Sequence, residues 1–351
     1  METKIKIDNL YNCLSKIIDY RGKTPKKLGF KWSKKGFRAI SAKNVKFDGL
    51  INLNSIKYVD SESYKKWMKE EIKKGDLLLT SEAPSGQVML WDSDEKIVLS
   101  QRLFCLRTKE NVDSTYLKYY LQSDIGQREI INKNSGSTVS GISVKTLNII
   151  QVLLPDIDKQ APIGKILYGL DKKIELNNRI NAELESISKL IYDYWFIQFD
   201  FPDKNGKPYK SSGGKMIYSK KLKRNIPQGW EVELLGNMLK VQKGISYKSS
   251  EIKTTNGVPM INLNSFNLNG TYKGNGIKYF TGKIPDLKIA MPNDLLIAST
   301  DVTRNADIIG KAILVPNYYT GKITYSMDIS KIIPDDGNLK LYLMMLFNSK
   351  H

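Results

Sequence analysis

The chain contains a diverged second copy of its own first half, and this internal repeat limits the possible folds more than any other feature. Four pairs of segments match at a nearly constant offset: 36–45 with 257–266, 76–81 with 294–299, Gly22-Lys23 with Gly244, and Tyr116-Leu117 with Tyr342-Leu343. The period is far longer than the ~20–50 residues of a solenoid repeat. We therefore predict two related domains that face one elongated or repeated target.

The composition is that of an ordinary folded protein. Of 351 residues 41% are hydrophobic and 10% aromatic, enough for two or three packed domains. No apolar run approaches the ~20 residues of a membrane span, and the N-terminus lacks the apolar core of a secretory signal. Cys13 and Cys105 lie in apolar segments without a CxxC or His partner, which indicates buried reduced thiols. We expect a cytoplasmic protein without a membrane partner.

The chain is strongly basic. Its 55 Lys and Arg outnumber 36 Asp and Glu, so the net charge is +19, which suits a long polyanion. A general enrichment in lysine is the alternative, but it would not leave the acidic residues so far behind. We therefore favour nucleic acid as the partner.

Hydrophobic periodicity predicts an α+β fold in which each copy is a mixed α and β domain. The predicted strands are 51–59, 76–80, 87–91, 97–106, 147–154, 295–299 and 311–315. The predicted helices are 7–18, 61–69, 114–132 and 339–348, the last being the counterpart of the helix at Ser114. A further helix start is expected near Trp230, where the second copy begins.

A long helix is predicted between the copies, over 158–198. Asp158 is a plausible N-cap, and Pro162 would fall in the first turn. Apolar residues then recur at steps of three and four, with a phase break at Asn177, which could set the register or be solvated. Such a seam favours a coiled-coil arm of about 50–60 Å over an amphipathic helix packed on its own domain. The seam residues are Ile163, Leu167, Leu170, Ile174, Ile180, Leu184, Ile187, Ile191 and Tyr194.

Residues 199–225 follow as a basic linker. Eight Lys or Arg accompany Gly213-Gly214 and the adjacent pair Ser211-Ser212, and no acidic residue follows Asp203 within this segment. We predict a mobile linker or loop, which either follows phosphates or is simply solvated.

No sequence motif for catalysis is present. The chain lacks a Walker A sequence, a GxGxxG and the Asn-Pro-Pro-Phe type of methyltransferase element. His351 is the only histidine, which argues against a histidine-based triad or zinc site. We therefore predict a binding protein that is not itself an enzyme and that holds no cofactor or metal of its own.

An ordered set of short motifs resembles the specificity subunits of type I restriction–modification systems. The motifs are Asp19-Tyr20-Arg21-Gly22-Lys23-Thr24-Pro25, Gly75-Asp76-Leu77-Leu78-Leu79-Thr80, Leu99-Ser100-Gln101-Arg102, Gly136-Ser137-Thr138, Leu153-Leu154-Pro155 before the long helix, and Ile226-Pro227-Gln228-Gly229-Trp230. Together they cover nearly the whole chain.

The resemblance implies a non-catalytic, DNA-reading subunit. Its parts would be a first target-recognition domain (1–157), a spacer helix (158–198), the basic linker (199–225) and a second target-recognition domain (226–351). Each domain would read one half of a bipartite double-stranded DNA site. The helix seam would bind methyltransferase subunits, and an ATP-dependent restriction and translocase subunit could join. S-adenosylmethionine and ATP would then belong to those partners.

Polar residues on the loops that carry the motifs are the candidates for DNA contacts, since phosphate contacts position a protein and base-edge contacts specify a sequence. The alternative for each is a solvated surface residue. The candidates are Arg21, Lys23, Ser85, Gln87, Gln101, Arg102, Lys243, Tyr247, Lys248, Arg304 and Asn305.

The second copy departs from the family pattern, because after Asn348 it lacks a counterpart of 136–155 and a second long helix. We expect a second domain that is incomplete at its C-terminus, and an apolar seam that associates with a second chain or with a methyltransferase. The alternative function is a truncated scaffold that binds the methyltransferase without productive DNA targeting.

Overall fold

The computed structural model describes residues 5–133 and 141–349. The chain divides into two compact units, unit 1 with residues 1–180 and unit 2 with residues 181–351, and each is described by itself. Within the described residues, no helix combines the length and apolarity that crossing a bilayer requires. The motif Gly136-Ser137-Thr138 lies outside the described residues.

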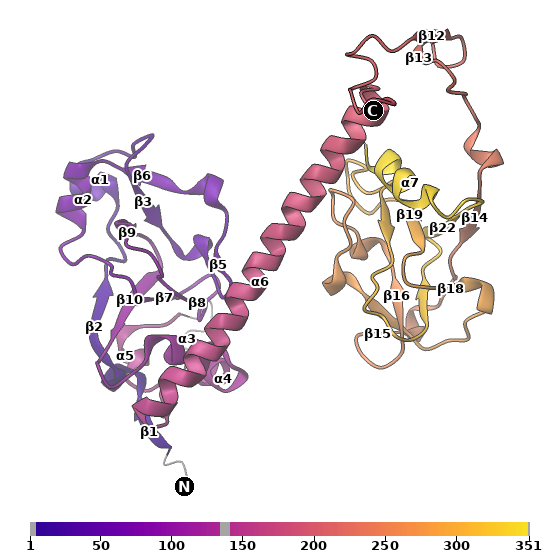
Figure 1. Ribbon diagram of the computed structural model, residues 1–351. Helices are drawn as coiled ribbons and strands as arrows, with labels where there is room; N and C mark the ends of the chain where they lie inside the picture. The colour runs from indigo at the N-terminus through magenta and orange to yellow at the C-terminus, as the bar shows by residue number, and fades with distance from the viewer. Residues whose placement is uncertain (1–4, 134–140, 350–351) are drawn as a thin grey trace. The chain divides into compact units, whose positions relative to one another are not determined.

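Unit 1 is built on a four-stranded antiparallel sheet in the order β2-β10-β7-β8 (Figure 1). Its strands are β2 Leu14–Asp19, β7 Leu77–Thr80, β8 Val88–Leu90 and β10 Leu103–Thr108. All four residues of β7 are buried, because both faces of the sheet are covered by apolar side chains.

A second sheet, β6-β3-β9, pairs β3 with β9 in parallel. Its strands are β3 Phe37–Ile40, β6 Lys57–Val59 and β9 Ile97–Leu99. Two small pairs complete the strands: β1 Lys6–Asn9 with β11 Gln151–Leu154, and β4 Val45–Lys46 with β5 Gly49–Leu50. The helices are α1 Pro25–Leu28, α2 Ser61–Trp67, α3 Ser114–Gln122, α4 Asp124–Lys133, α5 Val144–Leu147 and the first part of α6 Ile157–Tyr192.

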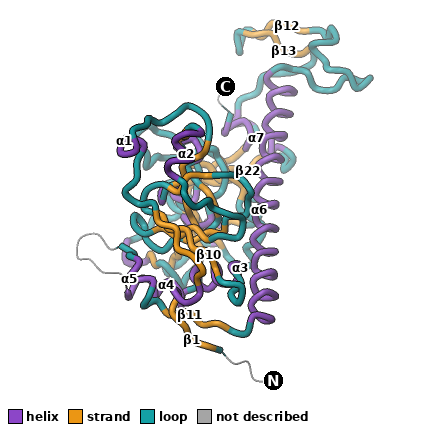
Figure 2. The backbone as a smooth tube through the Cα atoms, turned by 90° about the vertical axis from the view of Figure 1, so that its left-hand side faces the viewer, coloured by secondary structure: helices purple, strands orange, loops and turns teal. Residues whose placement is uncertain are grey.

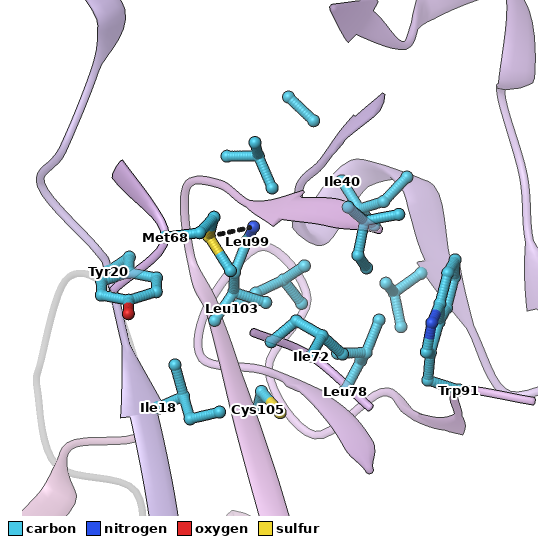
Figure 3. Packing of buried hydrophobic residues seen from close by; sticks show 14 of the residues in the cluster. Ile18, Tyr20, Ile40, Met68, Ile72, Leu78, Trp91, Leu99, Leu103 and Cys105 are labelled. Atoms are coloured by element: carbon cyan, nitrogen blue, oxygen red, sulfur yellow. Dashed lines mark hydrogen bonds between the residues drawn. The ribbon is translucent and has the colours of Figure 1, made fainter. Parts of the chain in front are cut away.

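Two hydrophobic clusters form the core of unit 1. One lies between the two sheets and α2, and Figure 3 shows Tyr20, Met68, Trp91 and Leu103 within it. The amide of Leu99 donates to the sulfur of Met68 over 3.4 Å in this cluster. The other cluster packs the opposite face of the four-stranded sheet against α3, α4 and α5. These clusters hold the strand ends, and the loops that follow them, at fixed positions.

Helix α6 is continuous through Asn177 and ends in a π-helical turn, Asp193–Ile197. The prediction of one long helix between the copies is confirmed (Figure 2). Two details are wrong: the helix begins at Ile157, so Asp158 is not its N-cap, and Pro162 is its sixth residue. The helix starts earlier than predicted because Asp156 already takes part in the turn that opens it, with the amide of Lys159 donating to the Asp156 carbonyl.

Unit 2 repeats this plan with a four-stranded sheet β14-β22-β19-β20 and a five-stranded sheet β15-β17-β16-β21-β18. The strands are β14 Leu239–Lys243, β15 Ile252–Lys253, β16 Val258–Ile261, β17 Lys278–Phe280, β18 Ile289–Ala290, β19 Leu295–Ala298, β20 Ala312–Leu314, β21 Ile323–Tyr325 and β22 Ile329–Pro334. Helix α7 spans Leu339–Asn348, the predicted bounds.

Strand register confirms the internal repeat. In unit 1 Phe37 pairs with Val59, and in unit 2 Val258 pairs with Phe280, so both members of the pair are displaced along the chain by the same offset. The parallel pair β3–β9 has its counterpart in β16–β21. One predicted match is wrong. Lys243 pairs with Ser330, and Asp19 pairs with Phe104 at the equivalent position of the other sheet. Lys243 therefore corresponds to Asp19, and Gly244 corresponds to Tyr20 rather than to Gly22.

Several predicted elements are wrong, because pairing between distant segments overrides the local pattern. The predicted helix 7–18 is β1, a 3-10 turn and β2, and no helix begins at Trp230. The predicted strand 97–106 is two strands joined by a turn at Ser100–Arg102, the helix 114–132 breaks at Ser123, the strand 51–59 contains a 3-10 turn, and 147–154 begins in a short helix.

The segment predicted as a mobile linker contains a β-hairpin, β12 Met216–Ser219 with β13 Arg224–Pro227 (Figure 2). An aromatic stack flanks it: the ring of Phe201 lies 4.8 Å from that of Tyr209 and 5.4 Å from that of Trp230. Asp200 accepts hydrogen bonds from the amide and hydroxyl of Ser211. These contacts give the basic segment a defined fold.

Candidate nucleic-acid interface

The predicted DNA-contact residues of unit 1 gather at one end of the four-stranded sheet. There β2 and β7 end and β10 and β8 begin, since Asp19 pairs with Phe104, Thr80 with Leu103 and Leu79 with Val88. The loops at this end carry Arg21, Ser85, Gln87, Gln101 and Arg102. Residues far apart in the sequence thus meet on one loop surface, which we call the reading end.

Arg102 is the exposed cation of the reading end. It stands in the turn between β9 and β10 with φ of 63°, in the left-handed region that costs most residues free energy. Its carbonyl accepts from the amide of Ser81 over 2.9 Å, which ties the turn to the β7–β8 loop. The side chain is 55% exposed, and its Nε lies 3.4 Å from the Glu82 carboxylate. An exposed guanidinium held by one long contact can turn to another acceptor.

Arg21, by contrast, is engaged inside the domain. Its guanidinium forms two hydrogen bonds with the Asp19 carboxylate, at 2.9 and 2.8 Å, and one with the Ile142 carbonyl at 3.0 Å. It also lies 3.8 Å from the centre of the Phe104 ring. Lys23 similarly donates to the Trp67 carbonyl and stacks over Tyr20. Both side chains hold the loop in place, so they are weaker candidates for DNA contacts than Arg102.

The β7–β8 loop is shaped by Thr80. Its hydroxyl donates to the Pro84 carbonyl over 2.6 Å and accepts from the Gln87 amide over 2.9 Å. Ser85 and Gln87 are at least partly exposed on this loop. The loop therefore presents both residues from a fixed backbone.

A lysine-lined groove borders the reading end. Its walls include Phe30, Trp32 and Gln101, and the lysines are Lys26, Lys31, Lys43 and Lys57. None of these four lysines forms an ion pair with a described residue. The groove was not predicted from the sequence, although the Lys and aromatic residues of 26–32 are a visible signal. Its charge suits phosphates.

In unit 2 the predicted residues again lie at or just beyond strand ends, at the equivalent end of the sheet. Lys243 is the last residue of β14, and Tyr247 and Lys248 follow it; Tyr247 is half-buried. Burial and the charge of Asp328 raise the pKa of Tyr247. The amide of Lys248 donates to Glu251, while its side chain is exposed.

Arg304 and Asn305 are exposed in the long loop between β19 and β20. Asp301 organises this loop by accepting from the amides of Thr303, Ile308 and Ile309. Desolvation opposes the charge of Asp301, but these hydrogen bonds dominate and lower its pKa. The loop corresponds to the β7–β8 loop of unit 1 and is several residues longer, so it projects the two side chains from an anchored base.

The basic hairpin segment is a second charged surface in unit 2. Its cationic side chains are exposed, and none pairs with a carboxylate among the described residues: Lys204, Lys207, Lys210, Lys215, Lys220, Lys221, Lys223 and Arg224. Arg224 packs over the Phe199 ring and donates to the Ile197 carbonyl.

Helix α6 exposes most of its predicted seam. Eight of the nine seam residues are 41–58% exposed, and Leu167 is half-buried. The first turns of α6 pack on α3, where Lys118 pairs with Asp171 at 2.6 Å and a Cβ on Gly164 would lie 2.9 Å from the Tyr116 amide. The helix prediction is confirmed; the coiled-coil pairing stays a prediction.

Both cysteines are free and buried, as predicted. Burial raises the pKa of the Cys13 thiol to about 11 and raises that of Cys105 as well. Within the described residues no group of three or more His, Cys, Asp or Glu is placed to hold a metal ion.

Comparison with known proteins identifies relatives. Residues 13–186, about half of the chain, match the family described as "Type I restriction modification DNA specificity domain". The type I restriction enzyme MjaIX specificity subunit of Methanocaldococcus jannaschii is 30% identical over 191 residues, covering 54% of this chain and 42% of that protein. The HindI specificity subunit of Haemophilus influenzae is 28% identical over 137 residues, 38% of this chain and 30% of that protein.

A solved structure shares the fold. The S subunit of a type I restriction-modification system from M. genitalium superposes with a TM-score of 0.56 at 13% identity, over 98% of this chain and 77% of that one. The chain spans half or less of the length of the curated relatives that it matches.

Proposed function

We propose that this chain, which belongs to the family of type I restriction–modification specificity subunits, reads a bipartite site on double-stranded DNA for an adenine methyltransferase. Unit 1 would read one half of the site and unit 2 the other. The chain itself would be non-catalytic, and S-adenosylmethionine would be held by its partner.

The observation that carries this proposal is the repetition of the reading end. The two four-stranded sheets share their strand order, and both gather polar loops where the counterparts of β2 and β7 end. Two similar loop surfaces suit two similar contacts with one duplex. Phosphate contacts by the lysines would supply affinity, and side chains at the reading end would supply sequence choice.

The proposed partner of helix α6 is a methyltransferase subunit. Eight exposed apolar residues along one helix form a stripe that is typical of an association surface. A restriction and translocase subunit would join through the methyltransferase, and self-association through α6 is a further proposal. The net charge of +19 on this chain should make its own DNA binding dependent on salt.

The decisive experiment maps adenine methylation genome-wide in cells that express the chain with its cognate methyltransferase, against cells that lack the chain. We expect a bipartite motif that depends on the chain. A palindromic motif would mean that one kind of domain reads both halves. If the methyltransferase binds the chain and no motif arises, the reading proposal fails.

A scaffold that binds methyltransferase without DNA targeting is the second candidate, and the exposed α6 stripe favours it equally. Two substitutions separate the candidates. Arg102→Ala should alter target choice and leave partner binding intact, whereas Ile187→Asp should weaken partner binding. If Arg102→Ala leaves the motif unchanged, the role of Arg102 as a reader is wrong.

A further inference from the structure

One turn occupies the same place in both units and carries opposite charges. In unit 1 it links β9 to β10 and holds Arg102; in unit 2 it links β21 to β22 and holds Asp328. The carbonyl of Arg102 accepts from the Ser81 amide over 2.9 Å, and that of Asp328 accepts from the Ser299 amide over 2.8 Å. These matched hydrogen bonds make Arg102 and Asp328 equivalent positions.

The start of the turn is matched as well. The amide of Ser100 donates to the Ile40 carbonyl over 2.8 Å, and the amide of Ser326 donates to the Ile261 carbonyl over 2.9 Å. Each turn is therefore fixed at both ends by the same backbone contacts. The two turns differ in the side chain that they present and also in backbone conformation, since Arg102 has φ of 63° whereas Asp328 does not have a positive φ.

The side chain that contacts this position also differs between the two units. Arg102 lies 3.4 Å from the carboxylate of Glu82, the residue after Ser81. Asp328 accepts from the hydroxyl of Thr300, the residue after Ser299, over 3.0 Å. A cation beside an acid in unit 1 is thus replaced by an acid beside a hydroxyl in unit 2, so the change involves a pair of residues.

We propose that Arg102 and Asp328 are equivalent specificity-determining residues that read opposite hydrogen-bonding patterns on base edges in the two halves of the target. This inference rests on the proposed function. A guanidinium only donates, and it matches the O6 and N7 acceptors of guanine. A carboxylate only accepts, and it matches the N4 amino group of cytosine.

The negative charge of Asp328 indicates which part of the DNA it would contact. Phosphates attract lysine and arginine anywhere on a DNA-facing surface, so a cation there has two possible acceptors. A carboxylate is repelled by phosphates, and a base amino group is the donor that offsets this repulsion. Asp328 is partly exposed next to Met327, which is 52% exposed in the same turn. The acid therefore marks a place where a base edge, rather than the backbone, approaches unit 2.

The geometry of the neighbouring groups supports this assignment. Gln101 lines the lysine-rich groove and directly precedes Arg102. Phosphates bound by the groove lysines would bring base edges toward this turn. In unit 2, Tyr247 follows β14 at the same end of the sheet, and burial together with the charge of Asp328 raises its pKa.

The test compares Arg102→Gln and Asp328→Asn, which remove charge and keep much of the side-chain shape. Their matched controls are Lys109→Gln and Asp335→Asn, just beyond the far ends of β10 and β22. Each chain is expressed with the cognate methyltransferase, its methylation motif is mapped, and partner binding is checked by co-purification. Purified complexes are also used to select sites from randomised duplex DNA.

We expect Arg102→Gln to relax one base position in one half of the motif by about tenfold in discrimination, and Asp328→Asn to relax one position in the other half. The controls should keep the wild-type motif. Unchanged motifs for both variants, changes in the same half, or a uniform loss of binding without relaxed base choice would each overturn the inference. A wild-type chain that yields no motif would instead overturn the proposed function.

Discussion

Units 1 and 2 stabilise the same buried strand with different cations. In unit 1 Asp76, which is 2% exposed, receives two hydrogen bonds of 2.8 Å from Arg107. In unit 2 the equivalent Asp294 pairs with Lys331 at 2.7 Å. Lys331 pairs with Leu296, and Cys105 pairs with the equivalent Leu78, so Lys331 corresponds to Cys105. The cation of unit 2 therefore stands two residues before the position of Arg107, on the same face of the strand.

This difference shows that the two copies share an ion pair to the same aspartate, although the residue that supplies the cation has changed. Residues two apart on a strand share a face, so either position can reach the aspartate. The same holds for a turn after β3 and β16: Ser41 and Asn44 form a reciprocal pair there, and in unit 2 Asn262 and Ser265 form it with the residue types exchanged. The scaffold is held constant while the sequence drifts.

Removing the aspartate should affect unit 1 more than unit 2. Asp76→Asn removes the bidentate carboxylate of Arg107 in a nearly buried site and leaves that arginine only its pair with Glu70, so it should cost about 2 kcal/mol. Asp294→Asn weakens a lysine pair whose carboxylate is more exposed than Asp76, at 15% against 2%, and should cost about 1 kcal/mol. Urea unfolding followed by tryptophan fluorescence would measure both, since Trp32, Trp67 and Trp91 report on unit 1 and Trp195 and Trp230 on unit 2. Equal losses would contradict the comparison.

A glycine at the start of β3 and β16 offers a second comparison. Gly36 has φ of +126°, and a Cβ there would lie 2.3 Å from the Val59 carbonyl oxygen; at Gly257 the Cβ would lie 2.8 Å from that of Phe280. Gly36→Ala should therefore cost about 2–3 kcal/mol, from strain and overlap together, and Gly257→Ala about 1 kcal/mol. Thermal unfolding of the two variants measures the difference, and a larger loss from Gly257→Ala would refute this reasoning.

The lysine-lined groove of unit 1 can be tested against its counterpart. Lys57 lies in β6 and Lys278 in β17 at the corresponding position. If both units hold phosphates on this face, Lys57→Ala and Lys278→Ala should each weaken DNA binding about threefold to tenfold and lower the salt slope by about 0.9. The methylation motif should stay the same. Binding titrations at several salt concentrations check this, and an effect from Lys57→Ala alone would mean that unit 2 approaches DNA differently.

The smallest expected effect concerns pH. Hydrogen bonds from Lys16 and Arg107 lower the pKa of Glu70 to about 2. A carboxylate with a lowered folded pKa stabilises the fold above its unfolded pKa, and this contribution is lost as the pH falls toward 2. Because Glu70 is partly exposed, the contribution is about 1 kcal/mol or less. Glu70→Gln should flatten the acid side of the unit 1 stability profile and leave unit 2 unchanged; urea midpoints at a series of acidic pH values would show it.

Local patterns predicted the elements whose signals lie within a few residues. The apolar spacing of α6, the buried run of β7 and the apolar run of α7 were readable because helical and strand periodicities are short-range. The segment 7–18 was not, because β1 pairs with β11, a strand that follows almost the whole of the first domain in the chain. The apolar pattern of 7–18 is compatible with a helix, and only the pairing with a distant strand shows that the segment is extended.

The candidate site divides in the same way. Polar loop residues were predictable as a class, but Arg21 is bound by Asp19 and by the carbonyl of Ile142, which lies far along the chain. Asp328 was missed, although it follows Arg102 at the same offset at which Tyr342 follows Tyr116. Strand register was needed to show that Arg102 and Asp328 occupy one position.

By itself the sequence determined that the chain contains an internal repeat, that a long helix separates the two copies, and that the protein has a net positive charge. Repetition, periodicity and charge are properties of the chain alone. Only the tertiary structure decided which polar side chains are engaged internally and which face outward, and that Arg102 and Asp328 are equivalent. Those outcomes depend on hydrogen bonds between segments far apart in the chain, whose energies no local window contains.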